Sequence, residues 1–218
     1  MSLMERYQAA VDELFAKIRD TQTDKIIQAG ELMANSLISG GKVILNEICH
    51  SIEADLVSRG GGPIYYKEYK EAEHKDTLKK GDVLVVSSVS GRTKEVVDLA
   101  YEMVERGVTV IAFTSMAYAT QVDPVHESGK KLYEFATLTI DNCAPAAEAM
   151  LEVDGIEARF AAASGIASNY IMWNITSATV EIMLQRGYTP GIFKSANYPN
   201  GAEYNKTVIE PHFEKYGY

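Results

Sequence analysis

The segment that decides the fold runs from Asp82 to Val97 and reads DVLVVSSVSGRTKEVV. Residues 83–86 are a short run of Val and Leu, which is typical of a parallel strand covered on both faces. Apolar residues then recur at helical spacing from Val96 to Val104. The segment therefore predicts a buried strand, a short turn and an amphipathic helix.

The turn between this strand and helix is rich in hydroxyl groups. Ser88, Ser90 and Thr93 lie close together in the sequence, and Gly91 gives the backbone room to turn. A strand that leads into a helix directs free amide N–H groups and the positive end of the helix dipole at one point. Such a point suits an anion, most often phosphate. The simpler interpretation, a residue that only caps the helix, needs fewer hydroxyls than this turn contains.

The pattern Ser-x-Ser-Gly-x-Thr-x-Glu, between a hydrophobic strand and a helix, resembles the phosphosugar-binding turn of the sugar isomerase (SIS) domain family. The resemblance implies that Ser88, Ser90 and Thr93 bind a substrate phosphate and that Gly91 allows its close approach. In layout the resemblance covers about residues 25–200, whereas its specific motifs are confined to a few short segments.

A second turn follows the same order of strand, hydroxyl and helix. Residues 42–48 predict a strand, and a helix is expected over residues 52–58. In the SIS family a serine after the first strand also contacts the phosphosugar, and Ser51 occupies that place. Cys49 and His50 stand where the family has a glycine, so the backbone approach is expected to differ. The His-Ser pair and the Arg-x-Gly-Gly that follows more closely resemble an uncharacterised bacterial branch of phosphoheptose-type isomerases in that family.

Strands that alternate with helices predict βαβ units and a mainly parallel sheet. We therefore expect an α/β protein with a three-layer αβα sandwich, flavodoxin-like and of SIS type, preceded by N-terminal helices. One SIS-type domain is expected over residues 1–218. Its parts are the N-terminal helices (1–40), the sheet core (41–162) and a long helix with a C-terminal tail (163–218).

Further elements are predicted from local patterns. They are two N-terminal helices with a break at residues 20–23, an edge strand at 63–69, a polar loop at 70–80, strands at 108–115 and 138–143, a hairpin at 149–160, a helix at 167–185 and a turn-rich tail at 194–205. Ligands of parallel sheets bind beyond the carboxyl ends of the strands. Ser51, Ser88, Ser90 and Ser115 all follow predicted strands.

Composition limits the classes of partner. The chain has 218 residues and a net charge of −9, which argues against broad nucleic-acid binding. No apolar run has the roughly 18 residues that a membrane span needs, and no signal peptide is visible. Two cysteines make no disulfide framework, so a cytoplasmic location is expected. No nucleic-acid or membrane partner is therefore expected. The family resemblance implies a small-molecule phosphosugar as the partner, and a homodimer or homotetramer.

No cofactor or metal is predicted. The four histidines show no helical pairing, and no G-x-G-x-x-G turn follows a strand. Aldose–ketose isomerisation needs a base near the reacting carbons. His50 and Glu53 are the catalytic candidates. Further candidates are Glu47, Glu203 and His212.

Phosphosugar isomerisation is the leading function that the resemblance implies. Two alternatives stay open: a phosphosugar sensor without turnover, and a lyase (etherase) that acts on a phosphosugar.

Overall fold

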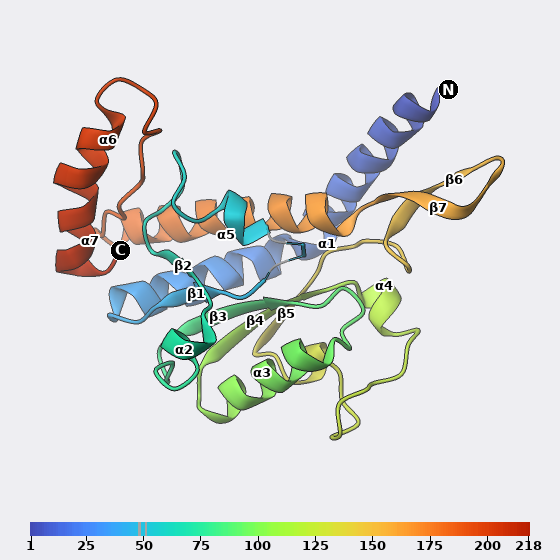
Figure 1. Cartoon of the computed structure of the whole chain (residues 1–218), viewed down its shortest axis with the longest axis horizontal. Helices are drawn as coiled ribbons and strands as arrows, with labels where there is room; N and C mark the ends of the chain where they lie inside the picture. Colours follow the sequence, from blue (N-terminus) through green and yellow to red (C-terminus); the bar gives the residue numbers. More distant parts are fainter. Residues whose placement is uncertain (48, 51) are drawn as a thin grey trace.

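The computed structural model describes residues 1–47, 49–50 and 52–218. At its centre lies a five-stranded sheet in the order β2-β1-β3-β4-β5, with every neighbouring pair parallel. Its strands are β1 (Val43–Leu45), β2 (Tyr66–Glu68), β3 (Val83–Ser87), β4 (Thr109–Thr114) and β5 (Leu138–Asp141). The two strands that precede the hydroxyl-rich turns, β1 and β3, are therefore neighbours, and β2 is the predicted edge strand (Figure 1).

Helices cover both faces of the sheet and complete three layers (Figure 1). The three long helices are α1 (Leu3–Ile38), α3 (Lys94–Glu105) and α5 (Ser164–Gln185). Val83 and Val85 of β3 pack into the core under α1 and α5, whereas Leu84 and Val86 pack into the core under α3. This alternation buries β3 on both sides, so the Val-Leu run correctly predicted its place. The predicted three-layer αβα sandwich with a mainly parallel sheet is confirmed.

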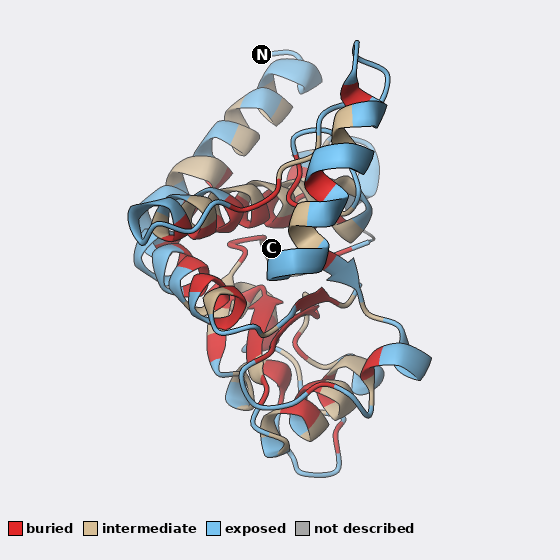
Figure 2. Cartoon of the chain, turned by 90° about the vertical axis from the view of Figure 1, so that its left-hand side faces the viewer, coloured by how far each residue is buried: buried red, intermediate tan, exposed pale blue. Residues whose placement is uncertain are grey.

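The inner faces of α1 and α5 are buried against each other and the sheet, as the colours of Figure 2 show. The two helices approach closely at Gly30, where an added Cβ would lie only 2.7 Å from Cβ of Ala178. Glycine at this position is therefore required by the helix crossing rather than by a turn.

The predicted break at residues 20–23 is wrong, because α1 runs through it as one helix. The hydroxyls of Thr21 and Thr23 each donate to the carbonyl four residues earlier, so these residues fit within the helix. Gln22 is buried and its side-chain oxygen accepts a hydrogen bond from the backbone N–H of Asp141 at 3.0 Å. The polar residues thus tie α1 to the edge strand β5.

The remaining elements are η1 (Ile52–Asp55), α2 (Glu71–His74), α4 (Met116–Ala119), η2 (Leu132–Glu134), β6 (Ala149–Val153), β7 (Ile156–Ala162), α6 (Gly201–Tyr204), η3 (Asn205–Ile209) and α7 (Glu210–Tyr216). The predicted hairpin is confirmed as β6–β7. The helix expected over residues 52–58 is only a short 3₁₀ turn, and the predicted polar loop contains α2. Within the predicted turn-rich tail (194–205), residues 194–200 form no helix and α6 begins at Gly201, and η3 and α7 follow towards the C-terminus.

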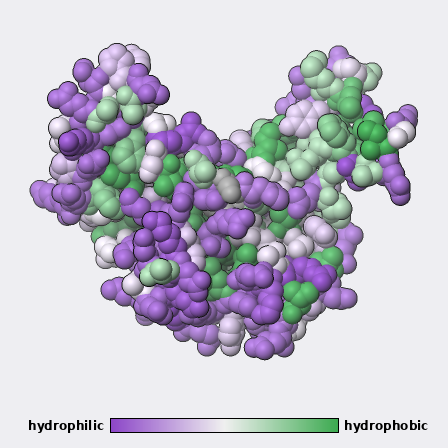
Figure 3. Space-filling model, in the orientation of Figure 1, coloured by the Kyte–Doolittle hydropathy of each residue, from purple (hydrophilic) through white to green (hydrophobic). Residues whose placement is uncertain are grey.

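Two projections rise from the body of the molecule (Figure 3). One is formed by the C-terminal elements α6 to α7, and the other by the start of α1 together with the β6–β7 hairpin (Figure 1). Exposed apolar side chains on the second projection include Leu3, Met4, Ile156 and Phe160. Within the described residues, no helix combines the length and apolar character needed to cross a lipid bilayer.

Candidate functional site

The turn after β3 is closed by its own hydroxyl groups. Oγ of Ser88 lies 2.8 Å from Oγ1 of Thr93 and accepts a hydrogen bond from the backbone N–H of Thr93 at 3.2 Å. Gly91 has φ +68°, and its N–H donates to the carbonyl of Ser88 at 2.9 Å. Glycine fits this left-handed position, where a side chain would be strained.

The turn leads directly into the N-terminus of α3. Among the described residues, none accepts a hydrogen bond from the backbone N–H groups of Lys94, Glu95 or Val96. These are the donors that the first turn of any helix leaves free, at the positive end of its dipole. The start of α3 therefore has free N–H donors beside the serine turn, and such donors suit an anion.

A cavity of about 270 Å³ lies at the carboxyl ends of β1 and β3. The described residues that line it are Glu47, Cys49, His50, Ser87, Ser88, Val89, Ser90, Thr93, Val96, Tyr118 and Glu148. They come from the ends of neighbouring strands, the start of α3, the short helix α4 and the loop before β6. The cavity thus combines the hydroxyl-rich turn with titratable side chains from distant parts of the sequence.

Two titratable groups of the cavity lie close to each other. Nε2 of His50 is 3.9 Å from Oε2 of Glu148, and the same carboxylate oxygen accepts a hydrogen bond from Oγ of Ser164 at 3.1 Å. The side chain of His50 is 80% exposed, whereas that of Glu148 is 29% exposed. The histidine is thus open to solvent, and the carboxylate is partly withdrawn from it.

Cys49 forms the buried floor of the cavity. Its Sγ lies 2.8 Å from Oγ of Ser87 and accepts a hydrogen bond from Oγ of Ser168 at 3.0 Å. Burial raises the pKa of the Cys49 thiol above its ordinary value, although both hydroxyls act in the opposite direction. The group is therefore a protonated thiol at neutral pH, which makes it a poor nucleophile.

The structure brings together some of the predicted site residues. Ser88, Ser90, Thr93 and His50 all line the cavity, as does Glu47. Ser51 lies outside the described residues.

Gly91 and Glu53 do not line the cavity among the described residues. A Cβ on Gly91 would lie 3.2 Å from both Ala119 Cβ and Thr114 Oγ1, so the close approach that glycine permits here is to the protein itself.

Ser115, at the end of β4, is fully buried. Its hydroxyl donates to the carbonyl of Ala144 at 2.6 Å and accepts from the N–H of Tyr118 at 3.1 Å. It therefore connects strand and loop instead of facing a ligand. Glu203 and His212 belong to the C-terminal projection and are not among the described lining residues.

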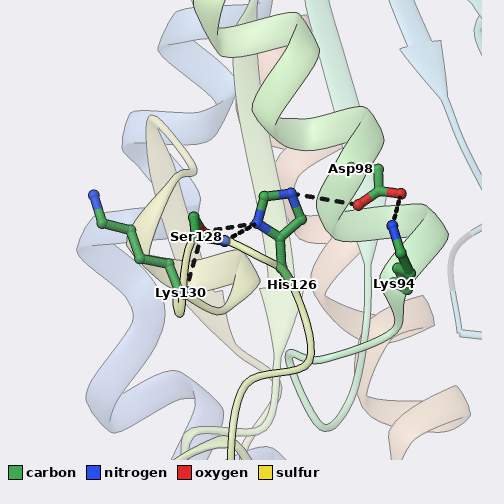
Figure 4. Close-up of polar contacts among 5 residues, drawn as sticks. All are labelled: Lys94, Asp98, His126, Ser128 and Lys130. Carbon is green, nitrogen blue, oxygen red and sulfur yellow. Dashed lines mark hydrogen bonds and ion pairs between the residues drawn. The ribbon is translucent and has the colours of Figure 1, made fainter.

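The described part of the chain places only one histidine, His50, in the cavity. His74 accepts a hydrogen bond from the N–H of Lys70, and His126 lies between Asp98 and Ser128 (Figure 4). Nδ1 of His126 accepts from the backbone N–H of Ser128, while Nε2 faces Asp98 at 3.4 Å. This buried ring fastens the loop after α4 to α3, so its contacts are structural.

Sequence reasoning missed Glu148 and Tyr118. Glu148 follows β5 and therefore reaches the same edge of the sheet as the serine turn, but nothing in its neighbouring residues indicates a site. Tyr118 arrives on the four-residue helix α4, which is too short to give a periodic signal. The described residues contain no group of three or more His, Cys, Asp or Glu side chains arranged to hold a metal ion.

Comparison with known proteins agrees with this class of fold. The family model of the SIS domain matches residues 62–115, which include β3 and its serine turn. Phosphoheptose isomerase GmhA from Neisseria gonorrhoeae has a similar fold, with a TM-score of 0.55 and 17% identity over 82% of this chain and 97% of that chain. The NanR protein of Vibrio vulnificus, solved in complex with ManNAc-6P, has a TM-score of 0.53, with 15% identity over 94% of this chain and 67% of that one.

The nearer relatives are bacterial proteins of the UPF0309 family. The Listeria monocytogenes member is 30% identical over 213 residues, which are 90% of this chain and 91% of the relative. The Oceanobacillus iheyensis member is 29% identical over the full length of both chains. The chain belongs to the UPF0309 family, and its residues 62–115 match the SIS domain model.

Proposed function

We propose that the protein binds a phosphorylated sugar in this cavity and interconverts its aldose and ketose forms. The observation that carries the proposal is the meeting of two features in one cavity. The serine turn and the free amides of α3 offer donors to a phosphate, and His50 with Glu148 offers a pair for proton transfer.

The phosphate-binding part needs no basic side chain. Ser88 and Thr93 already hold each other, so the turn keeps its shape before a ligand arrives. Amide N–H groups and hydroxyls at a helix N-terminus can bind a dianion even in a protein of net charge −9. Anchoring the phosphate would fix the reacting carbons of the sugar near the titratable pair and supply the positioning that isomerisation requires.

The chemistry needs one group that removes a proton from carbon and one that protonates the neighbouring oxygen. An imidazole titrates near neutrality and can serve either role. His50 is the described histidine that faces the cavity, and it is accessible to a ligand from solvent. The solved proteins of similar fold support a phosphosugar ligand, because one is a phosphoheptose isomerase and one is complexed with ManNAc-6P.

The direct test is turnover in D₂O. A panel of aldose and ketose phosphates that includes heptose phosphates would be incubated with the protein and followed by NMR. An isomerase produces the partner sugar and incorporates deuterium at C1 or C2. A sugar phosphate that binds but shows neither change would support the sensor alternative, and cleavage of an ether-linked phosphosugar without isomerisation would support the lyase alternative.

A further inference from the structure

Two backbone segments beside the cavity share a rare conformation. Cys49 and His50 have φ values of +37° and +65°, and Ala147 and Glu148 have values of +58° and +70°. Elsewhere in the described chain, no two adjacent non-glycine residues both lie in the left-handed region. Such residues are strained, persist only where surrounding contacts hold them, and concentrate at functional sites. The first pair presents the imidazole of His50 and the buried thiol of Cys49 to the cavity, and the second presents the carboxylate of Glu148.

Fixed contacts hold Glu148 in this position. Its carboxylate accepts the hydroxyl of Ser164, which is fully buried and is the first residue of α5. Its backbone N–H donates to the carbonyl of Pro145, and its own carbonyl accepts from the N–H of Ala163, both at 2.9 Å. Both ends of the residue are thus fastened, and the carboxylate is directed at the cavity beside His50.

The other carboxylate of the cavity lacks such support. Glu47 is exposed, and its side chain has no hydrogen bond or ion pair with any residue that the structure describes. A positioned group is worth more to catalysis than a mobile one, because the geometry of proton transfer is set in advance. Of the two carboxylates, Glu148 is therefore the better placed for chemistry.

We infer that Glu148 is the base that moves the proton between C1 and C2, and that Ser164 is its positioning residue. The inference rests on the proposed isomerisation. Glu148 takes the proton from C2 of the open-chain aldose, and the C–H electron pair becomes the C1–C2 double bond. The carbonyl electrons move to O1, which accepts a proton from the His50 imidazolium, and the product is an enediol.

The second half of the reaction reverses these roles. Neutral His50 takes the proton from the C2 hydroxyl, and its electron pair forms the C2 carbonyl. The double-bond electrons take the proton of Glu148 at C1. C1 is reduced, C2 is oxidised, and both side chains regain their starting states, so no further reactant is needed. The separation of 3.9 Å between His50 and Glu148 lets both groups face neighbouring atoms of one ligand.

Glu148→Gln tests the base. The variant keeps the size of the side chain, and we expect it to lower kcat by about 10²- to 10⁴-fold with little change in KM. Deuterium incorporation from D₂O should fall in parallel, while the increase in Tm given by the phosphosugar remains. The matched control is Glu152→Gln, because Glu152 lies on the adjoining hairpin and pairs with Arg159 away from the cavity. Glu152→Gln should keep both kcat and deuterium incorporation.

Ser164→Ala tests the positioning residue. Loss of its hydrogen bond to a charged group should lower kcat on the order of tenfold. In the Glu148→Gln background, Ser164→Ala should lower kcat much less, because the hydroxyl of Ser164 acts through the carboxylate of Glu148. An equal loss in both backgrounds would overturn the assignment of Ser164.

Full deuterium incorporation by Glu148→Gln, or its loss in Glu47→Gln instead, would overturn the assignment of Glu148. If the wild type itself incorporates no deuterium from any member of the panel, the proposed isomerisation fails, and the roles of both residues fail with it.

Discussion

Ser88 and Thr93 hold each other across five positions of the turn, with 2.8 Å between their hydroxyl oxygens. Ser88 also accepts the N–H of Thr93, so it fixes the entry into α3. One hydroxyl of the turn is therefore structural as well as available to a ligand. Ser90 differs, because its hydroxyl has no partner among the described residues although it lines the same cavity.

Substitutions in the turn should separate binding from stability. Ser90→Ala should weaken phosphosugar binding about tenfold or more, which is the cost of a lost hydrogen bond to a charged group, and leave the Tm of the free protein unchanged. Ser88→Ala should weaken binding and also lower that Tm, because the turn loses its internal bond. Calorimetric titration and thermal unfolding measure the two effects. A fall in the Tm of free Ser90→Ala with unchanged affinity would contradict this division.

The histidines offer a second pair of variants. His50→Asn should reduce turnover by about a hundredfold or more while it keeps phosphosugar binding and the Tm of the free protein. His126→Asn should instead lower the Tm of the free protein and keep turnover, because the buried ring of His126 connects the loop after α4 to α3 through Asp98. Steady-state kinetics and thermal unfolding of both variants give the comparison. Unchanged turnover in His50→Asn would remove this histidine from the mechanism.

The contact of α1 with α5 can be tested at two helical glycines. Gly30→Ala should lower the free energy of unfolding, because its Cβ would lie 2.7 Å from Ala178 and the helices would have to separate. Gly165→Ala should raise it by about 0.5 kcal/mol, since an added Cβ meets nothing within 4 Å and alanine favours the helix. Urea unfolding measures both variants. Equal effects of the two substitutions would show that the helices do not approach closely at Gly30.

The buried phenol of Tyr66 predicts a loss of stability in alkali. Burial raises the pKa of Tyr66 from 10.0 to about 12, while its OH lies 2.9 Å from Oγ1 of Thr176. The unfolded chain releases this proton at lower pH than the folded protein does. The contribution of Tyr66 is therefore complete below pH 10 and is lost as the pH rises towards 12. The free energy of unfolding should fall less steeply between pH 10 and 12 in Tyr66→Phe than in the wild type. Identical slopes against pH would contradict the burial of the phenol.

Much of the fold could be predicted because its signals are local. The Val-Leu run before the serine turn predicted a strand covered on both faces, and the local pattern of residues 149–160 predicted the hairpin. The predicted break in α1 was wrong because Gln22 stays in the helix and hydrogen-bonds to β5, more than a hundred residues away in the sequence. A polar residue that bonds a distant strand looks the same in the sequence as one that ends a helix.

The candidate site likewise contains residues that the sequence predicts from a local signal and residues that only the tertiary fold brings together. Ser88, Ser90 and Thr93 are recognisable because they follow one strand within one short segment. Glu148 and Ser164 could not be found, because their positions depend on where β5, the hairpin and the start of α5 meet in space. Glu53, a catalytic candidate from the sequence, lies in the predicted helix over residues 52–58. Only a 3₁₀ turn forms there, and its side chain is not among the described lining of the cavity.

Phosphate recognition is the central claim, and a comparison of each sugar phosphate with its unphosphorylated parent tests it most directly. Thermal unfolding of the wild type would be measured with ManNAc-6P, with aldose and ketose phosphates, and with the corresponding free sugars. At a concentration of about 100 Kd, a bound ligand stabilises the folded state by about 2.7 kcal/mol. At least one phosphosugar should therefore raise the Tm by several degrees while its free sugar does not. Equal Tm values with and without every phosphosugar, or equal shifts from the free sugars, would contradict the account.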